Sequence, residues 1–190
     1  PIAFSLIGAS LFYFTFINNT IPMEKVIQQF VTSIESFPYL AVPFFIMVGA
    51  VMNYSGISEA LMDLANILVG HTRGGLAQVN VLLSALMGGI SGSANADAAM
   101  QSKMLVPEMT KKGFSLEFSG AVTAASSAVS PVIPPGTNLI LFSIIAGIPV
   151  GSMFLAAYGP GILMTVALMI TVQIIAVRRK YKPNLEKRAT

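Results

Sequence analysis

Long apolar runs, interrupted at a few defined places, dominate the chain from end to end. Charged residues are absent from 1–23, 36–58, 74–96 and 118–177. A helix needs about 20 mostly apolar residues to cross a bilayer, so each run is long enough to cross once and the last is long enough to cross twice. The pattern therefore predicts an all-α integral membrane protein.

Two polar stretches beside these runs have the period of an amphipathic helix. In residues 23–37 and again in 57–70, apolar side chains recur at helical spacing, with charged and amide side chains on the opposite face. Helices of this kind lie in the membrane interface. We therefore expect residues 1–70 to form scaffold helices, with spans at 1–17 and 38–56 and an interfacial helix after each span.

Basic residues predict the orientation of the chain. The positive-inside rule places residues 71–73, 111–112 and 178–190 on the cytoplasmic side. Between the first two clusters, the continuous apolar stretch GGLAQVNVLLSALM is shorter than a membrane span. We therefore expect residues 74–110 to form a re-entrant helical hairpin, which enters the membrane part way and returns to the same side.

The tip of this predicted hairpin is unusually polar for a membrane segment. It reads GGISGSANADAAM at 88–100, and polar groups buried at such a tip need partners, so Ser91, Ser93 and Asn95 are candidate functional residues. Asp97 is open to two interpretations. It caps the returning helix and pairs locally, or it lies in or just behind an ion or substrate site.

The next predicted span, 114–148, is interrupted in its middle. The sequence PVIPPG at 131–136 separates two half-length helices at 119–130 and 137–148. The second half-helix begins with Thr137 and Asn138, an N-cap-like start.

The prolines of this break remove backbone donors. Because proline has no N–H, the carbonyls of Ser127, Ser130 and Pro131 are expected to lose their helical partners. Each unsatisfied group in hydrocarbon costs several kcal/mol, so these carbonyls need protein, water or a cation nearby.

Two interrupted helices at membrane depth are typical of secondary transporters. Half-helix N-termini face anionic substrate groups, and unwound carbonyls coordinate the coupling cation. Hard oxygens suit an alkali cation better than a transition metal in a chain with one histidine and no cysteine. Residues 71–148 are thus predicted to form half of a transport domain, and 149–190 a transmembrane helix with a basic cytoplasmic end. The expected substrate contacts are Ser93, Asn95, Thr137 and Asn138, supported by Asp97 and Ser127.

Composition narrows the function further. Of the 190 residues, 54% are hydrophobic and only 10% are charged, whereas soluble domains carry about 25% charged residues. The chain contains no G-x-x-x-x-G-K-[ST] motif, which disfavours an ATP-driven pump. An intramembrane hydrolase using Ser91 or Ser93 with Lys103 as base is also disfavoured, because helix rise separates them by roughly 15 Å. We therefore expect a protein that is not an enzyme.

The quoted segments resemble a known transporter family. The tip GGISGSANADAAM, the following MLVPEMTKKGFS and the stretch from FSGAVTAASS through SPVIPPG are similar to the large membrane subunit of TRAP (tripartite ATP-independent periplasmic) transporters. The resemblance extends over essentially the whole chain and implies the N-terminal half of that subunit.

This resemblance implies an ion-transporter-type elevator fold, in which two inverted repeats each contribute a re-entrant hairpin and a discontinuous transmembrane helix. One such repeat is expected here. The implied function is import of organic acids, such as C4-dicarboxylates or sialic acid, across the bacterial inner membrane with a sodium gradient. The implied sodium site uses backbone oxygens at the tip, around Ser91, and in the break, around Ser130, Ile133 and Pro135.

The resemblance also implies the partners. These are a periplasmic substrate-binding protein, a small four-helix membrane subunit, the remaining C-terminal half of the large subunit and membrane lipid, whereas no nucleic acid is expected. Two alternatives remain open: a sodium/dicarboxylate carrier of the same superfamily that needs no binding protein, and a non-transporting scaffold or channel subunit.

Overall fold

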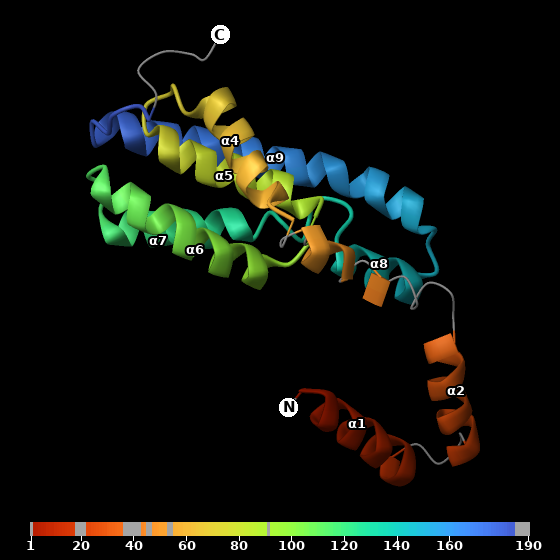
Figure 1. The fold of residues 1–190 in the computed structure, drawn as a ribbon. Coiled ribbons are helices and arrows are strands. Elements are labelled where there is room, and N and C mark those ends of the chain that lie inside the picture. The colour runs from red at the N-terminus through yellow and green to blue at the C-terminus, as the bar shows by residue number, and fades with distance from the viewer. Residues whose placement is uncertain are drawn as a thin grey trace. The chain divides into compact units, whose positions relative to one another are not determined.

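The computed structural model describes residues 2–17, 22–35, 43–44, 47–52, 55–90 and 92–184. Every regular element in these ranges is a helix (Figure 1), which confirms the all-α prediction for this part of the chain. The chain divides into two compact units, Pro1–Ala41 and Val42–Thr190.

The first unit contains two helical segments. Helix α1 (Ile2–Phe12) continues into the π-helix η1 (Tyr13–Ile17), and α2 follows at Met23–Glu35. The predicted interfacial helix at 23–37 therefore corresponds to α2, up to the end of the described residues. Of the predicted span at 38–56, residues 43–44 and 47–52 are described as helical and 55–56 as a turn, and the rest lies outside the described residues.

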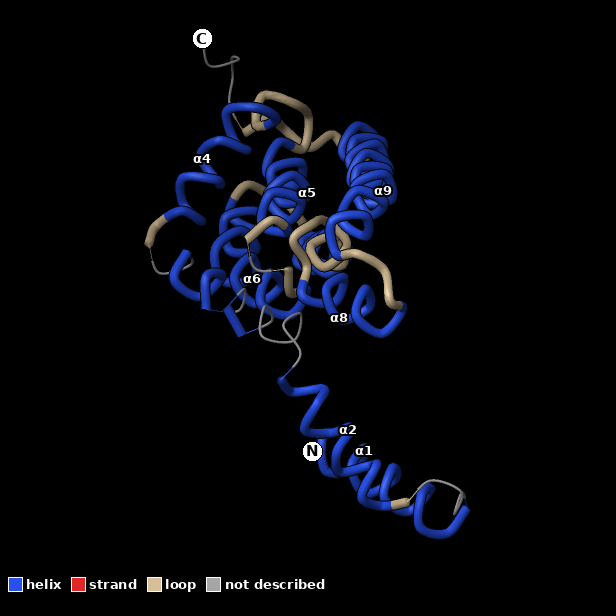
Figure 2. The backbone as a smooth tube through the Cα atoms, turned by 90° about the vertical axis from the view of Figure 1, so that its right-hand side faces the viewer, coloured by secondary structure: helices blue, strands red, loops and turns tan. Residues whose placement is uncertain are grey.

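The second unit holds the six remaining labelled helices. They are α4 (Ile57–Val69), α5 (Gly75–Gly88), α6 (Ala94–Lys111), α7 (Leu116–Ser127), α8 (Thr137–Ala146) and α9 (Val150–Arg178). Helix α5 is central to the unit, because it contacts α4, α6, α7 and α9. Figure 2 shows it among α4, α6 and α9. Helix α9 is the longest and also contacts α7 and α8.

Local sequence explains where several of these helices begin and end. Ser93 and Ser115 are the N-caps of α6 and α7, and their hydroxyls accept hydrogen bonds from the N–H groups of Ala96 (3.4 Å) and Phe118 (3.3 Å). Helix α8 ends at Gly147, whose φ of 66° is a left-handed conformation that favours glycine.

The core of the second unit forms around α5. Its side chains pack with residues of α6, α7 and α9 in one apolar cluster, whose members include Leu83, Met87, Leu105, Met109 and Val122. The same helix also buries polar side chains, and these connect α5 to its neighbours by hydrogen bonds.

The outer faces of α9 and α6 differ in chemistry. Among the described residues, α9 is the one helix long and apolar enough to cross a membrane, with a mean hydropathy of 2.2. Its exposed side chains include Leu155 and Leu163, which are 76% and 70% exposed. The exposed positions of α6, which include Asn95, Ser102 and Lys103, hold no large apolar side chain. Helix α9 therefore suits contact with lipid, and the outer face of α6 does not.

Candidate functional site

The turn between α5 and α6 lies directly against the chain between α7 and α8. A Cβ atom built on Gly92 would lie 2.9 Å from the Cα atom of Gly136, and one built on Gly88 would lie 2.8 Å from the carbonyl oxygen of Ser130. Both distances are shorter than real Cβ contacts, so this approach needs glycine at both positions. Gly92 also has a φ of +54°. The two interruptions identified in the sequence therefore meet in space.

Two helix N-termini converge where the interruptions meet. Helix α6 begins after Ser93 and α8 begins after Gly136. A Cβ built on Gly92 would lie 3.3 Å from the backbone nitrogen of Thr137, so the start of α8 adjoins the turn that leads into α6. Helix N-termini carry partial positive charge and unpaired N–H groups, and two of them together favour an anion.

Carbonyl oxygens of the break approach the same turn. A Cβ on Gly92 would lie 3.1 Å from the carbonyl oxygen of Pro135, and one on Gly89 would lie 3.7 Å from that of Pro134. No described residue donates a hydrogen bond to the carbonyl oxygens of Ser130 or Pro131. These oxygens are therefore the kind of ligand that a hard cation takes.

The prediction that Ser127 has a free carbonyl is wrong. Its oxygen accepts a hydrogen bond from the N–H of Ser130, with a distance of 3.3 Å. The loss of the proline N–H removes a partner four residues ahead, but the chain turns tightly after α7 and supplies one three residues ahead instead.

Asp97 connects the start of α6 to the break. Its Oδ2 lies 2.8 Å from the hydroxyl of Ser130, and its Oδ1 accepts a hydrogen bond of 2.7 Å from Nε2 of Gln101. The Ser130 hydroxyl is also 2.9 Å from the carbonyl oxygen of Ser84 on α5, and its single proton can be donated to one of these two acceptors at a time. Gln101 completes the ring through a 2.6 Å hydrogen bond to the Ser84 hydroxyl.

The four residues of this ring are buried inside the unit. Asp97 is 1% exposed, and Ser84, Gln101 and Ser130 are 0% exposed. The Asp97 carboxylate is therefore hydrogen-bonded by two neutral side chains, those of Gln101 on α6 and Ser130 in the break. No basic residue lies in the same helical turn of α6.

A second buried network joins α5 to α7. The side-chain amide of Asn80 donates to the hydroxyl of Thr123 at 2.8 Å and accepts from the hydroxyl of Ser126 at 2.8 Å. Neither Asn80 nor Gln101 was among the residues predicted from the sequence. For Asn80 the available signal was an amide side chain inside an otherwise apolar or small-residue helix, where an unpaired polar group is costly, whereas α6 around Gln101 carries several other polar and charged residues.

The predicted substrate contacts lie at the helix N-termini. The hydroxyl of Ser93 caps α6, Thr137 is half-buried, and Asn95 and Asn138 are exposed. Helix α8 begins at Thr137, as predicted, but the expectation of an N-cap-like residue there is wrong, because the N-cap is Gly136. A Cβ at that position would lie 2.7 Å from the carbonyl oxygen of Pro131, which explains why glycine occupies the cap.

The other predicted residues have different surroundings. Ile133 lies between two helices, since Cβ atoms built on Gly88 of α5 and Gly161 of α9 would lie 2.9 and 2.8 Å from its side chain. The hydroxyl of Ser127 donates to the carbonyl of Thr123 at 2.7 Å, within α7. Ser91 lies outside the described residues.

The donor set at this place fits an alkali cation. Within the described ranges, no group of three or more histidine, aspartate or glutamate side chains could hold a metal ion. What the tip and the break offer instead are backbone carbonyls and serine hydroxyls, together with the buried carboxylate of Asp97, which is hydrogen-bonded to Ser130. Oxygen donors with one carboxylate suit a hard, singly charged cation better than a transition metal.

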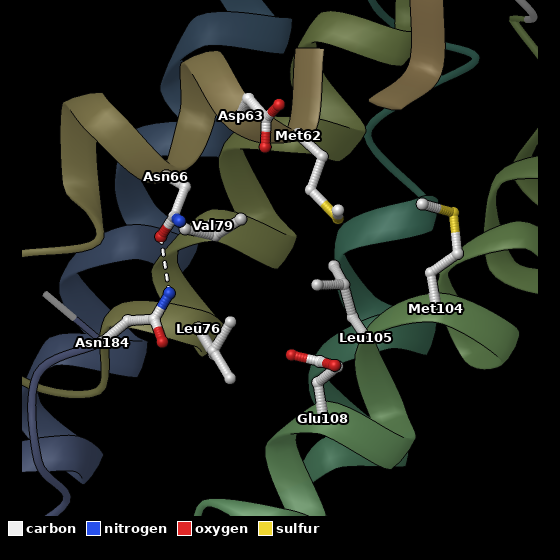
Figure 3. Close-up of a pocket in the computed structure, with 9 residues that line it drawn as sticks. All are labelled: Met62, Asp63, Asn66, Leu76, Val79, Met104, Leu105, Glu108 and Asn184. Carbon is white, nitrogen blue, oxygen red and sulfur yellow. Dashed lines mark hydrogen bonds between the residues drawn. The ribbon is translucent and has the colours of Figure 1, made fainter. Parts of the chain in front are cut away.

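A separate cavity of about 280 Å³ lies between α4, α5 and α6 (Figure 3). Apolar side chains line most of it, with the carboxylates of Asp63 and Glu108 at its edges and a 2.6 Å hydrogen bond from Asn184 to Asn66 at one side. It contains none of the residues predicted for the site, and its two carboxylates disfavour an anionic ligand.

Comparison with known proteins places these features in context. The whole chain, residues 1–190, matches the family described as the DctM component of tripartite ATP-independent periplasmic transporters. The sialic acid TRAP transporter large permease protein SiaM of Vibrio cholerae is 37% identical over 95% of this chain and 42% of its own length.

Two further relatives have other transported compounds in their names. The 2,3-diketo-L-gulonate TRAP transporter large permease protein YiaN of Escherichia coli is 35% identical over 90% of this chain and 40% of its own length. The isethionate TRAP transporter permease protein DctMQ of Oleidesulfovibrio alaskensis is 32% identical over 89% of this chain and 27% of its own length. The chain thus spans less than half of each of these relatives.

Proposed function

The chain belongs to the family of DctM components of tripartite ATP-independent periplasmic transporters, and from this premise we propose that it forms part of the membrane permease of a sodium-coupled importer of organic acids. The names of three relatives support the substrate class, since sialic acid is an organic acid and 2,3-diketo-L-gulonate and isethionate are anions of organic acids. The proposed location is the bacterial inner membrane.

The convergence of the two interruptions is the observation that carries this proposal. Carbonyl oxygens of the break and the N-termini of α6 and α8 lie against the same turn. The first group attracts a cation and the second attracts an anion. A sodium ion bound at the carbonyls increases the positive potential beside the helix N-termini, so each ligand favours binding of the other. This reciprocity is the basis of coupled transport.

We assign the residues to the two ligands accordingly. Backbone oxygens at the tip, around Ser91, and in the break, around Ser130, Ile133 and Pro135, form the sodium site. The organic acid contacts Ser93, Asn95, Thr137 and Asn138. Asp97 supports the arrangement through its hydrogen bond to Ser130, and Ser127 supports it from the end of α7.

The proposed fold follows the family. Helices α5 and α6 form a re-entrant hairpin within residues 74–110, and α7 and α8 are the halves of one discontinuous transmembrane helix within 114–148. Together they form half of a transport domain that moves as an elevator relative to scaffold helices in 1–70. The segment 149–190 adds a transmembrane helix with a basic cytoplasmic end, and an inverted repeat completes the permease.

The proposed partners are a periplasmic substrate-binding protein that delivers the organic acid and a small four-helix membrane subunit that supports the scaffold. The test is uptake into proteoliposomes that contain the complete permease, the small subunit and the binding protein. We expect uptake of the organic acid to require an inward sodium gradient. Equal uptake with potassium in place of sodium would overturn the proposed coupling.

The same preparation tests two other functions. Sodium-driven uptake that persists without any binding protein would indicate a carrier of the same superfamily that works alone. No uptake under any gradient, with every subunit present, would indicate a scaffold or channel subunit.

A further inference from the structure

Gln101 has a buried side chain whose orientation is determined by its neighbours. Its Nε2 donates to the Ser84 hydroxyl on α5 and to the carboxylate of Asp97 on α6, at 2.6 and 2.7 Å. A carboxylate only accepts hydrogen bonds, so the amide nitrogen, and not the amide oxygen, must face Asp97. The Gln101 side chain therefore links α5 to Asp97 on α6, and Asp97 is the residue that is hydrogen-bonded to Ser130 in the break.

The oxygen end of the Gln101 side-chain amide is in an energetically unfavourable environment. Oε1 of Gln101 is buried and has no hydrogen-bond partner among the described residues. An unsatisfied buried acceptor is destabilising, and an apolar side chain of similar size would avoid that cost. The donor end of Gln101 contributes what an apolar residue cannot, a hydrogen bond to the buried carboxylate of Asp97, which restrains the position of that group.

We propose that Gln101 is a positioning residue for the coupling cation. It holds Asp97 in the rotamer that reaches Ser130, and Ser130 in turn belongs to the segment whose carbonyls face the hairpin turn. Without Gln101, the carboxylate loses one of its two side-chain partners and the break loses its fixed position against the turn. This inference rests on the sodium-coupled transport proposed above.

Gln78 provides a matched control within the same unit. It is also a buried glutamine, 3% exposed, and its Oε1 is likewise unpartnered among the described residues. Its Nε2, however, donates to the carbonyl of Met169 at 2.9 Å and to the side chain of Gln173 at 3.2 Å, both on α9. Gln78 thus connects α5 to a different helix and has no bond to the tip or the break.

The experiment compares Gln101→Met with Gln78→Met in the complete transporter. Three quantities are measured: the sodium concentration for half-maximal uptake, the substrate KM at saturating sodium, and the rise in thermal unfolding midpoint on adding sodium to the detergent-solubilised complex. For Gln101→Met we expect the half-saturating sodium concentration to rise about tenfold, as expected for loss of a hydrogen bond to a charged group. The sodium-induced thermal shift should fall in parallel.

The control separates positioning from general stability. Gln78→Met should change the unfolding midpoint without sodium, and leave the half-saturating sodium concentration at the wild-type value. If Gln101→Met does not assemble, Gln101→Asn replaces it, because the shorter amide keeps its donors but cannot reach both Ser84 and Asp97. An unchanged sodium response in the assembled Gln101 variant overturns the inference. An equal change in sodium response for both glutamines also overturns it.

A double substitution tests whether Gln101 acts through Asp97. In an Asp97→Asn background, Gln101→Met should cause much less than its effect in the wild type, because the carboxylate that it positions is gone. Full additivity contradicts the inference. Failure of the proposed function is a distinct result: wild-type uptake and wild-type thermal stability would then both be independent of sodium.

Discussion

Ser130 and Asp97 lie within hydrogen-bonding distance, with 2.8 Å between the serine hydroxyl and the carboxylate, although 33 residues separate them in the chain. One belongs to the proline-rich break and the other to the first turn of α6. Because both are buried, this contact ties the first turn of α6 to the non-helical segment between α7 and α8.

Substitution of Asp97 by alanine tests this connection. The change leaves the buried donors of Ser130 and Gln101 without their carboxylate, so we expect the unfolding free energy to fall by about 1–3 kcal/mol. We also expect sodium-driven uptake to fall strongly while the protein still inserts into the membrane. Thermal unfolding in detergent and uptake in proteoliposomes measure the two effects. Asp63→Ala, at an exposed position on α4, should change neither. Normal uptake by the Asp97 variant would show that the contact is not needed for transport.

A methyl group at Gly92 tests the close approach of the two interruptions. In Gly92→Ala the new Cβ would lie 2.9 Å from the Cα atom of Gly136, on a backbone with φ of +54°, so the turn must move away from the break. We expect the half-saturating sodium concentration to rise at least about tenfold, since the ligand geometry is lost. Gly120→Ala is the control, because nothing lies within 4 Å of a Cβ there. That exposed helical position should tolerate alanine or gain up to about 1 kcal/mol of stability. Identical sodium responses in the two variants would contradict the prediction.

Substitution of Asn80 should lower the stability of the protein, whereas substitution of Asn95 should raise the substrate KM. Asn80→Ala removes the buried link to Thr123 and Ser126, so we expect a loss of about 1–3 kcal/mol in unfolding free energy. Asn95 is exposed beside the start of α6, so Asn95→Ala should raise the substrate KM with little change in stability. Unfolding midpoints and uptake kinetics of both variants make the comparison. A large stability loss in the Asn95 variant, with an unchanged KM, would argue against its assignment to the substrate.

The segment after α9 is held at the far end of the unit from the turn. Asn184 donates through its backbone to the carbonyl of Gly70 at 2.9 Å and through its side chain to Asn66 at 2.6 Å, and it accepts from Lys112. Asn184→Ala should accelerate hydrogen exchange in this segment and cost about 1 kcal/mol. Lys182→Ala, at an exposed position, provides the comparison. Equal exchange rates in the two variants would show that the side chain of Asn184 does not anchor the segment.

Short-range signals in the sequence located the helices and their interruptions. Glycines and small polar residues predict a turn near 88–95, and α5 and α6 are separated at Gly89–Ser93. Prolines predict a break at 131–136, and the backbone is non-helical from 128 to 136. Both signals act within a few residues through steric limits and missing donors, so a single sequence suffices to read them.

The contacts between the two interruptions could not be predicted from the sequence. The pairing of Asp97 with Ser130 depends on how α5, α6 and α7 pack, and nothing in one helix determines the register of another. Gln101 could not be identified from the sequence because α6 also carries Asn95, Ser102 and Lys103, so an amide on this helix does not by itself indicate a buried position. The carbonyl of Ser127 shows a further limit of sequence reasoning. The absence of an N–H on Pro131 predicts that this carbonyl loses its helical donor, but it does not predict that the N–H of Ser130 replaces that donor.

The polar outer face of α6 has a consequence for biosynthesis. A helix that presents Asn95, Ser102 and Lys103 together gains little from moving sideways out of the translocon into acyl chains. It must remain beside the translocon, or in contact with water, until other parts of the polypeptide shield it. Insertion of α6 is therefore expected to depend on the segments that pack against it, such as α5 and α7.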